Sequence, residues 1–143
     1  MGFLGIVPKV SLFTVPYAVL AFYLNLRLNF SFLRFPVLGS VLLTAGIVLW
    51  LLCYRQISKA YRRGELLTTG CYSKVRHPIY SIWGFLIVPG FSLAIGGFML
   101  GLPLVYWLAL VKFIGEEEKA LEERFGDGWR EYTKRTGRFL PRI

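Results

Sequence analysis

The sequence predicts an all-α integral membrane protein with about four transmembrane helices and a C-terminal amphipathic helical segment. Of the 143 residues, 55% are hydrophobic and the mean hydropathy is +0.54, whereas soluble domains are about 45–50% apolar. The apolar residues gather in long runs instead of alternating with polar ones. A chain of this length accommodates about four membrane spans and their connections, and we expect residues 1–143 to form a single domain.

Four apolar runs are candidate membrane spans, since crossing the hydrocarbon core takes about 17–25 residues. The third and fourth runs are at the lower limit of this length, and the sequence does not fix whether both cross fully. The first run contains Pro16, which a membrane helix tolerates because neighbouring groups can satisfy the freed carbonyl. The second run carries no charge. The third and fourth are separated only by Gly96 and Gly97, which predicts a tight antiparallel hairpin. The expected spans cover residues 7–26, 35–54, 79–95 and 98–114.

The basic residues favour one side of the membrane. The chain has 17 Lys and Arg residues and a net charge of +9. Most of these cations lie in a predicted loop over residues 55–78 and in a segment that includes the tail, residues 116–143. An excess of Lys and Arg marks cytoplasmic segments, so we expect the loop, the tail and both termini on the cytoplasmic side, next to anionic membrane lipids. No nucleic-acid-binding module is recognisable, and we expect no nucleic-acid partner.

The tail is predicted to hold an amphipathic helix that lies on the membrane. Leu121, Phe125, Trp129 and Tyr132 recur at spacings of four, four and three residues, which places them on one helical face. A glycine at position 126 and another at 128 are expected to bend this helix.

The chain has two cysteines, Cys53 and Cys71, too few for a disulfide framework or a metal cluster. Cys53 lies within an apolar run and Cys71 follows a turn glycine. We expect two reduced, unpaired thiols and no metal ion.

A first cluster of candidate functional residues ends where the third span begins. It includes His77, the single histidine of the chain, between Arg76 and Pro78. Proline suits the first turn of a helix, because its missing N–H would be unpaired there anyway. Arg76 and His77 are therefore placed at a helix N-terminus, which favours an anionic group. The alternative is an interfacial anchor in the lipid headgroup region.

A second cluster, Glu116-Glu117-Glu118, follows the fourth span directly. The alternative to a functional role is a solvated helix N-terminus whose dipole the carboxylates complement. A functional role requires a cationic partner, such as a sulfonium or an ammonium group. Tyr72 and Tyr80 could add cation–π contacts to that cation.

Together these clusters carry a family resemblance. Residues 76–80, Arg-His-Pro-Ile-Tyr, resemble the R-H-P-x-Y signature of the isoprenylcysteine carboxyl methyltransferase and phospholipid methyltransferase superfamily. Glu116-Glu117 with Leu121, then Phe125-Gly126, Trp129 and Tyr132, and finally residues 138–141 (Arg-Phe-Leu-Pro) match the family in order and spacing. The resemblance covers about residues 64–141, over half of the chain.

The resemblance implies a membrane-embedded fold unrelated to Rossmann-type methyltransferases, with S-adenosylmethionine (SAM) as cofactor. The absence of a G-x-G-x-x-G loop agrees with this. Gln56 matches a family glutamine only after a shift of one residue. The positions that match the family's cofactor contacts are Gly64, Glu65, Leu66, Leu67, Tyr72, His77, Pro78, Ile79, Tyr80 and Glu117.

The sequence departs from the family at one substrate position. Members that methylate prenylcysteine carry a substrate-binding arginine four residues before the cofactor-binding glutamate. Here that position is Phe113, with Lys112 adjacent. We expect substrate contacts at these two residues, although lysine lacks the bidentate fork that suits a carboxylate.

The implied reaction is methyl transfer from SAM to a lipophilic, membrane-associated acceptor, most simply the carboxylate of a prenylated cysteine. We expect Arg76 and His77 to be catalytic, the first by orienting substrate or cofactor and the second by accepting a proton when the acceptor must lose one. Glu117 is expected to anchor the cofactor. Two alternatives stay open: a phospholipid amine or small thiol as acceptor, and a non-catalytic membrane subunit. The sequence does not fix the oligomeric state.

The acceptor is expected to reach the site from the membrane. The third span begins directly at the R-H-P-x-Y segment, and the hairpin over residues 79–114 is rich in glycine and aromatic residues. Gly84 and Gly90 are expected to give close helix approach or room for an acyl or prenyl tail.

Overall fold

The computed structural model describes residues 4–142. Within that range the chain is almost entirely helical, and its β-structure is limited to one isolated bridge between Val75 and Gly137. The elements in chain order are α1 (Val7–Leu28), α2 (Pro36–Arg63), the 3₁₀ turn η1 (Gly70–Tyr72), α3 (Pro78–Ile82), the π-helical turn η2 (Trp83–Ile87), α4 (Val88–Ile95), the 3₁₀ turn η3 (Gly97–Gly101), α5 (Leu102–Phe125) and α6 (Asp127–Arg135).

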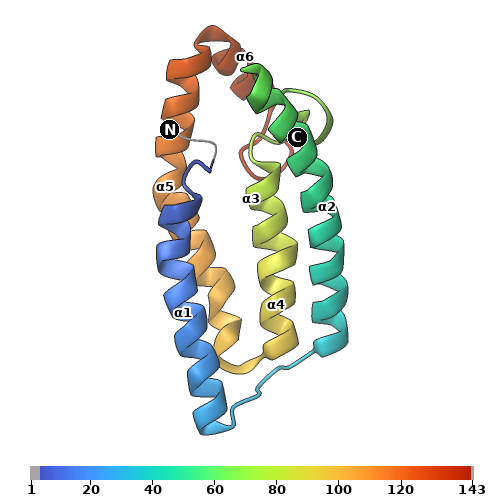
Figure 1. Cartoon of the computed structure of the whole chain (residues 1–143), viewed down its shortest axis with the longest axis vertical. Coiled ribbons are helices and arrows are strands. Elements are labelled where there is room, and N and C mark those ends of the chain that lie inside the picture. The colour runs from blue at the N-terminus through green and yellow to red at the C-terminus, as the bar shows by residue number, and fades with distance from the viewer. Residues whose placement is uncertain (1–3, 143) are drawn as a thin grey trace.

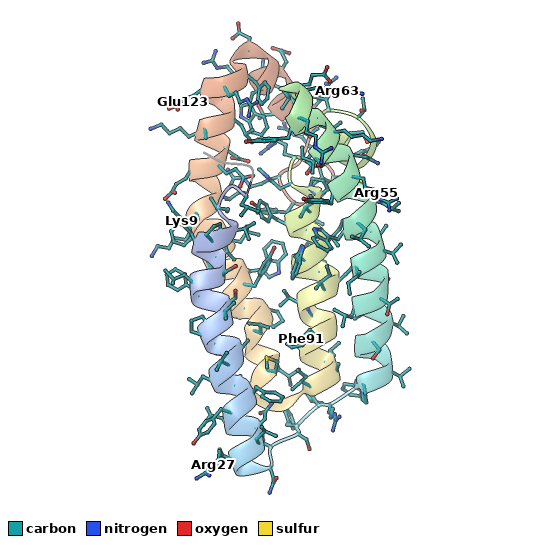
Figure 2. All side chains as sticks on the ribbon, in the orientation of Figure 1. Lys9, Arg27, Arg55, Arg63, Phe91 and Glu123 are labelled. Carbon is teal, nitrogen blue, oxygen red and sulfur yellow. A yellow bond between two sulfur atoms is a disulfide. The ribbon has the colours of Figure 1, made fainter. Side chains whose placement is uncertain are left out.

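Four helical segments are long and apolar enough to cross a membrane, which confirms the predicted all-α membrane fold. They cover Val7–Leu28, Pro36–Arg63, Pro78–Ile95 and Gly97–Phe125. Large apolar side chains point outward along them (Figure 2), with Leu12 71% exposed on α1 and Val37 79% exposed on α2. Such a surface is costly in water and suits lipid. The chain is an integral membrane protein.

Prolines and glycines set most helix boundaries. A proline occupies the first or second position of each of α1, α2, α3 and α5, where its missing N–H leaves no hydrogen bond unmade. Gly64 caps the C-terminal end of α2 with a left-handed backbone conformation, φ of 67°. Glycine adopts this conformation with less steric strain than any other residue.

The third span is one continuous helix with a wider turn in its middle. η2 lies between α3 and α4, and Pro89 follows two residues later. A proline in a regular α-helix clashes with the carbonyl four residues earlier, here that of Phe85. The π-helical turn includes Phe85 and accommodates the proline without ending the span.

The long helices pack as two pairs. α1 lies along α5, and α2 lies along α3 and α4, with α6 covering one end of the molecule (Figure 1). Glycines bring α2 and α4 together: a Cβ on Gly39 would lie 2.5 Å from the Gly90 carbonyl oxygen, and a Cβ on Gly90 would lie 2.7 Å from the Leu43 nitrogen. Close backbone approach at small residues is typical of membrane helix pairs.

A buried asparagine ties the two pairs together at the end opposite α6. The Asn25 amide donates to the carbonyl oxygen of Gly96 at 3.0 Å, and its side-chain oxygen accepts from the Phe98 N–H at 2.9 Å. The Gly97 N–H donates to the Phe32 carbonyl at 2.7 Å. The turn between the third and fourth spans is thus held against the end of α1.

Three boundaries differ from the sequence-based expectation. α2 continues to Arg63, beyond the apolar run that ends near residue 54, so the expected loop shrinks to residues 64–77. The Gly96-Gly97 join is a longer turn that includes η3. α5 continues through the three glutamates to Phe125, and the tail helix breaks at Gly126, whose φ is 57°.

Candidate active site

The R-H-P-x-Y segment is held in place by the C-terminal strap, which we define as residues 136–142. The Arg76 N–H donates to the Gly137 carbonyl at 2.8 Å, and the His77 N–H donates to the Arg138 carbonyl at 3.1 Å. The Ser81 hydroxyl donates to the Phe139 carbonyl at 2.6 Å. These bonds fix the backbone just where α3 begins.

His77 lies buried between two consecutive glutamates of α5. Its Nε2 is 3.1 Å from Oε1 of Glu118, and its Nδ1 is 3.7 Å from Oε1 of Glu117. Only 3% of the side chain is exposed. The Phe139 ring packs 6.0 Å from the imidazole, centroid to centroid. The single histidine of the chain therefore lies between two carboxylates, and only the one of Glu118 is within hydrogen-bond distance.

Glu117 joins three distant parts of the chain. The Tyr80 hydroxyl donates to its Oε2 at 2.7 Å, and the Ile6 N–H donates to the same oxygen at 3.3 Å. Ile6 is fully buried, and a Cβ added to Gly5 would overlap the Glu117 carboxylate. The segment before α1 thus lies directly over this glutamate, a contact that no local sequence signal indicates.

The Arg76 guanidinium is largely occupied by protein groups. Its Nη1 donates to the carbonyl oxygens of Thr133 and Thr136, at 3.3 and 2.8 Å, and its Nε donates to Glu118 at 3.3 Å. Thr133 and Thr136 lie at the C-terminal end of α6, where unpaired carbonyls and the helix dipole favour a cation. Arg76 therefore holds α6 against the site.

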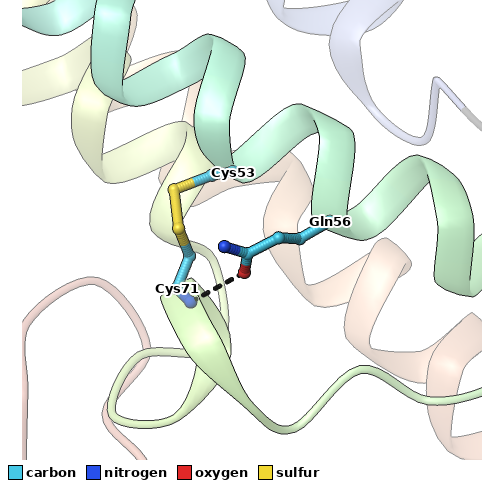
Figure 3. The surroundings of a disulfide bond; sticks show 3 residues. All are labelled: Cys53, Gln56 and Cys71. Atoms are coloured by element: carbon cyan, nitrogen blue, oxygen red, sulfur yellow. Dashed lines mark hydrogen bonds between the residues drawn. A yellow bond between two sulfur atoms is a disulfide. The ribbon is translucent and has the colours of Figure 1, made fainter.

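The η1 turn is fastened to α2 and to α6. Tyr132, from the predicted aromatic face, donates its hydroxyl to the Tyr72 carbonyl at 2.6 Å. The Gln56 side-chain oxygen accepts from the Cys71 N–H at 3.0 Å (Figure 3). Burial raises the pKa of Tyr132 to about 12, against the lowering effect of Arg76 and Arg135, and so keeps its hydroxyl protonated as a donor.

The expectation of two reduced thiols was wrong. Cys53 and Cys71 form a disulfide with a Cα–Cα distance of 5.7 Å, beside the Gln56 contact (Figure 3). The cysteines are 18 residues apart, and only the return of the η1 turn onto α2 brings them together. This fold-back is not readable from local sequence.

A cavity of about 720 Å³ lies beside the R-H-P-x-Y segment, Glu117 and Tyr72. Its polar end lies under α6, and its apolar end lies between the α1–α5 pair and the α2–α3–α4 group. Most of the predicted cofactor positions line it, together with Arg76: these are Glu65, Leu66, Leu67, Tyr72, His77, Ile79, Tyr80 and Glu117.

Four predicted positions do not line the cavity. Gly64 serves as the cap of α2, with its missing side chain facing Arg124, and Pro78 is buried in the first turn of α3. Phe113 packs against Phe13 of α1 at 5.8 Å between ring centroids, and Lys112 lies over the same two rings. α1 covers this face of α5, so neither residue reaches the cavity.

Several residues that line the cavity were not assigned a role from sequence. On the polar side, Arg124 lies over the rings of Tyr61 and Phe125, and Trp129 is 4% exposed. The aromatic spacing of the tail indicated Phe125 and Trp129 but not what they face. All four membrane-spanning segments contribute to the lining of the apolar end, which includes Thr14, Val15, Ala18, Leu43, Trp50, Trp83, Ile87, Val88, Phe91 and Leu102.

The arrangement suits a cationic ligand with a polar portion. Glu117 supplies a carboxylate, Tyr72 and Tyr80 supply aromatic side chains, and His77 lines the cavity with its Nδ1 3.7 Å from that carboxylate. Carboxylates and aromatic rings both stabilise ammonium and sulfonium groups. The residues present therefore fit SAM, whose donor group is a sulfonium.

Comparison with known proteins bears on this site. No protein-family model matches the chain, and no solved structure matches it. The chain is 32% identical over 117 residues to Protein-S-isoprenylcysteine O-methyltransferase of Schizosaccharomyces pombe, an alignment that covers 79% of this chain. The chain spans about half the length of that relative, 49%. This similarity confirms the resemblance to the isoprenylcysteine carboxyl methyltransferase superfamily that the R-H-P-x-Y and Glu-Glu motifs indicated.

Proposed function

We propose that this protein is a SAM-dependent methyltransferase that acts on a lipophilic acceptor in the membrane, with the carboxylate of a prenylated cysteine as the favoured acceptor. The observation that carries this proposal is the continuous cavity. Its polar end holds Glu117, His77 and Tyr80, and its apolar end lies between membrane-spanning helices. One cavity thus has room for a charged methyl donor and for the tail of a membrane acceptor.

Each polar residue has a definite task in this proposal. Glu117 and His77 bind the cationic part of the cofactor, and Tyr72 and Tyr80 place aromatic faces beside it. Bound SAM supplies an electrophilic methyl group. Transfer of that group to a carboxylate forms a C–O bond and breaks the S–CH₃ bond, so no proton has to move. The main requirements are alignment and exclusion of water.

The cation that meets an acceptor carboxylate is then Arg124 or Arg76, since Lys112 lies outside the cavity. Arg124 lines the polar mouth and, among the residues described, makes no ion pair. Its contacts are with the rings of Tyr61 and Phe125. An arginine can grip a carboxylate through two parallel hydrogen bonds, and Arg124 has the position for this.

One observation favours a second acceptor class. His77 lines the cavity, and its Nδ1 is the ring nitrogen that does not contact Glu118. A lipid amine or a thiol has a proton to lose on methylation, whereas a carboxylate has none. Phospholipid-amine and small-thiol acceptors therefore stay as the alternative within the same enzyme class.

We further propose that the site and both termini face the cytoplasm, where the excess of Lys and Arg would place them. The Cys53–Cys71 disulfide argues against a cytoplasmic location, because cysteine pairs are usually reduced in the cytosol. A cytoplasmic site thus requires that the Cys53–Cys71 pair be protected from, or responsive to, cellular reductants. Measuring on which side of the membrane the termini lie decides between a cytoplasmic and a non-cytoplasmic site.

The proposed function is tested by measuring the binding of S-adenosylhomocysteine, which is the product left when SAM has lost its methyl group. Purified protein in nanodiscs should bind one molecule per chain by calorimetry and gain thermal stability through mass action. Glu117→Ala serves as the matched variant with a damaged site. Absence of saturable binding in nanodiscs and in several detergents would remove the methyltransferase proposal and leave a non-catalytic membrane subunit.

A further inference from the structure

Glu118 lies behind His77, away from the cavity. It accepts from His77 at 3.1 Å and also from Arg76 and Arg138, whose shortest contacts are 3.3 and 2.6 Å. Its side chain is 15% exposed. Glu118 does not line the cavity, whereas Glu117 does. Glu118 is thus a partly buried carboxylate that contacts His77, Arg76 and Arg138, and its role differs from that of Glu117.

The contact with Glu118 indicates which nitrogen of His77 carries a proton. An ionised carboxylate only accepts hydrogen bonds, so the nitrogen facing it has to be protonated. That nitrogen is Nε2. In the neutral imidazole, Nδ1 is then an acceptor, and it faces Oε1 of Glu117 across 3.7 Å.

We infer that Glu118 is a positioning residue, which holds His77 with its proton on Nε2 so that Nδ1 and Glu117 form a pair of acceptors facing the cavity. With no donor between them, Nδ1 of His77 and the Glu117 carboxylate repel each other. A ligand that donates hydrogen bonds to both removes this repulsion. An ammonium group has three donors and a positive charge, so it satisfies both. Assigning that ammonium to the methionine portion of SAM rests on the proposed function; the proton position on His77 does not.

The same geometry predicts what loss of Glu118 does. Without it, Glu117 is the nearest carboxylate to His77, and the proton is expected to move to Nδ1. Nδ1–H of His77 would then donate a hydrogen bond to the Glu117 carboxylate. With that bond made, the pair would bind an ammonium group less well. Glu118 therefore acts on the ligand through His77 and not by touching it.

Because the chain has a single histidine, labelling with ¹⁵N-histidine gives one imidazole whose two nitrogens report its tautomer by NMR without any assignment problem. In nanodiscs the neutral imidazole is expected to carry its proton on Nε2. In Glu118→Ala it is expected on Nδ1. A wild-type proton on Nδ1, protons on both nitrogens, or an unchanged tautomer in Glu118→Ala would each overturn the inference.

The variant Glu118→Gln distinguishes a role of Glu118 in fixing the His77 tautomer from a role in stabilising the fold through its ion pairs. Its amide oxygen still accepts from Nε2–H, but the negative charge that faces Arg76 and Arg138 is lost. Both variants should lower the melting temperature, whereas only Glu118→Ala should change the tautomer and weaken S-adenosylhomocysteine binding, on the order of tenfold or more. The matched control is Glu123→Ala, since Glu123 is exposed and makes no ion pair with any described residue.

The two proposals fail in distinguishable ways. A wild type that does not bind S-adenosylhomocysteine contradicts the proposed function but leaves the tautomer result standing. A wild type that binds it with the proton on Nδ1 contradicts the role of Glu118 alone. Equal loss of affinity in the Gln and Ala variants would make Glu118 a structural residue only.

Discussion

The hydroxyl of Tyr80 donates a 2.7 Å hydrogen bond to the carboxylate of Glu117. This bond links the last residue of the R-H-P-x-Y signature to the glutamate that the family resemblance marks as a cofactor anchor. The two halves of the motif, 37 residues apart in sequence, thus meet at one pair of atoms.

Glu117→Ala should weaken S-adenosylhomocysteine binding by about 1.5–3 kcal/mol, because a sheltered charge-assisted contact is lost. Glu122→Ala should have little effect, since Glu122 is exposed and pairs with exposed Arg130. Calorimetry on the three proteins measures this. Equal affinities in both variants would contradict the anchor role of Glu117.

Methyl transfer should become more efficient as the acceptor's tail lengthens. Each buried methylene contributes about 0.8 kcal/mol, and the apolar end of the cavity has the lining to bury several. The measurement is a transfer assay on acceptors that share one headgroup and differ in tail length.

Ala18→Phe should reduce the advantage of long tails, because Ala18 lines the apolar end. Val19→Phe is the matched control, since Val19 is 65% exposed on the lipid-facing side. Short, water-soluble acceptors that react as efficiently as long ones would instead favour a small thiol as acceptor.

Gly90→Leu should destabilise the fold, because its side chain would meet the backbone of α2 at Gly39 and Leu43. Overpacking of this kind costs about 1–3 kcal/mol or more. A Cβ on Gly84 would instead meet the side-chain ring of Trp107, and neither glycine lines the cavity. Of the two sequence-based expectations for these glycines, the structure therefore supports close helix approach and not room for a lipid tail.

Gly115→Ala is the contrasting variant. A Cβ at this position of α5 has no neighbour within 4 Å, and alanine is a better helix former than glycine by about 1 kcal/mol. Thermal unfolding should rank Gly115→Ala at or above wild type and Gly90→Leu well below it. The reverse order would contradict the close α2–α4 packing.

Removal of the disulfide should lower stability by about 3 kcal/mol, the expected effect of opening a loop of this size. Reductant should lower the melting temperature of the wild type and leave the Cys53→Ser, Cys71→Ser double variant unchanged. A wild type that is insensitive to reductant and labels as two free thiols would show that the bond does not form.

Both termini should be inaccessible from outside intact cells. Single cysteines added next to Met1 or Ile143 in the Cys53→Ser, Cys71→Ser background can be probed with a membrane-impermeant thiol reagent. No labelling before permeabilisation, and labelling after it, is the expected result. Labelling from outside would place the disulfide in an oxidising compartment and overturn the charge-based sidedness.

Hydropathy predicted the four spans because each helix contains a long run of apolar residues. It did not predict where the helices end, because a helix can continue beyond its apolar run. α2 continues about two turns beyond the apolar run that ends near residue 54 and is capped by Gly64, whose backbone is left-handed. Likewise α5 carries the glutamates on helical backbone and ends only at Gly126.

The candidate site was predictable where the family motif specifies residue types, and not where it depends on contacts between distant segments. Glu117 and Tyr80 belong to the motif, and they meet. The Ile6 N–H reaches Glu117 from 111 residues away, and the Cys53–Cys71 bond depends on the fold-back of η1. Phe113 was expected at the substrate because of its spacing from Glu117, but α1 occupies that face of α5.

The pairing of the helices has a consequence for how many acceptors one site can serve. The α1–α5 pair and the α2–α3–α4 group are tied by Asn25 at one end and by the Glu117 contacts at the other. Between these ties, two further hydrogen bonds join α5 to the third span: the Tyr106 hydroxyl donates to the Tyr80 carbonyl at 2.9 Å, and the Trp107 Nε1–H donates to the Gly84 carbonyl at 3.1 Å. The spacing of the helices beside the cavity is therefore fixed along the spans as well as at their ends. For the proposed methyltransferase, this limits the width of the tail that an acceptor can carry, so a change of acceptor would need substitutions along the spans as well as at the polar end.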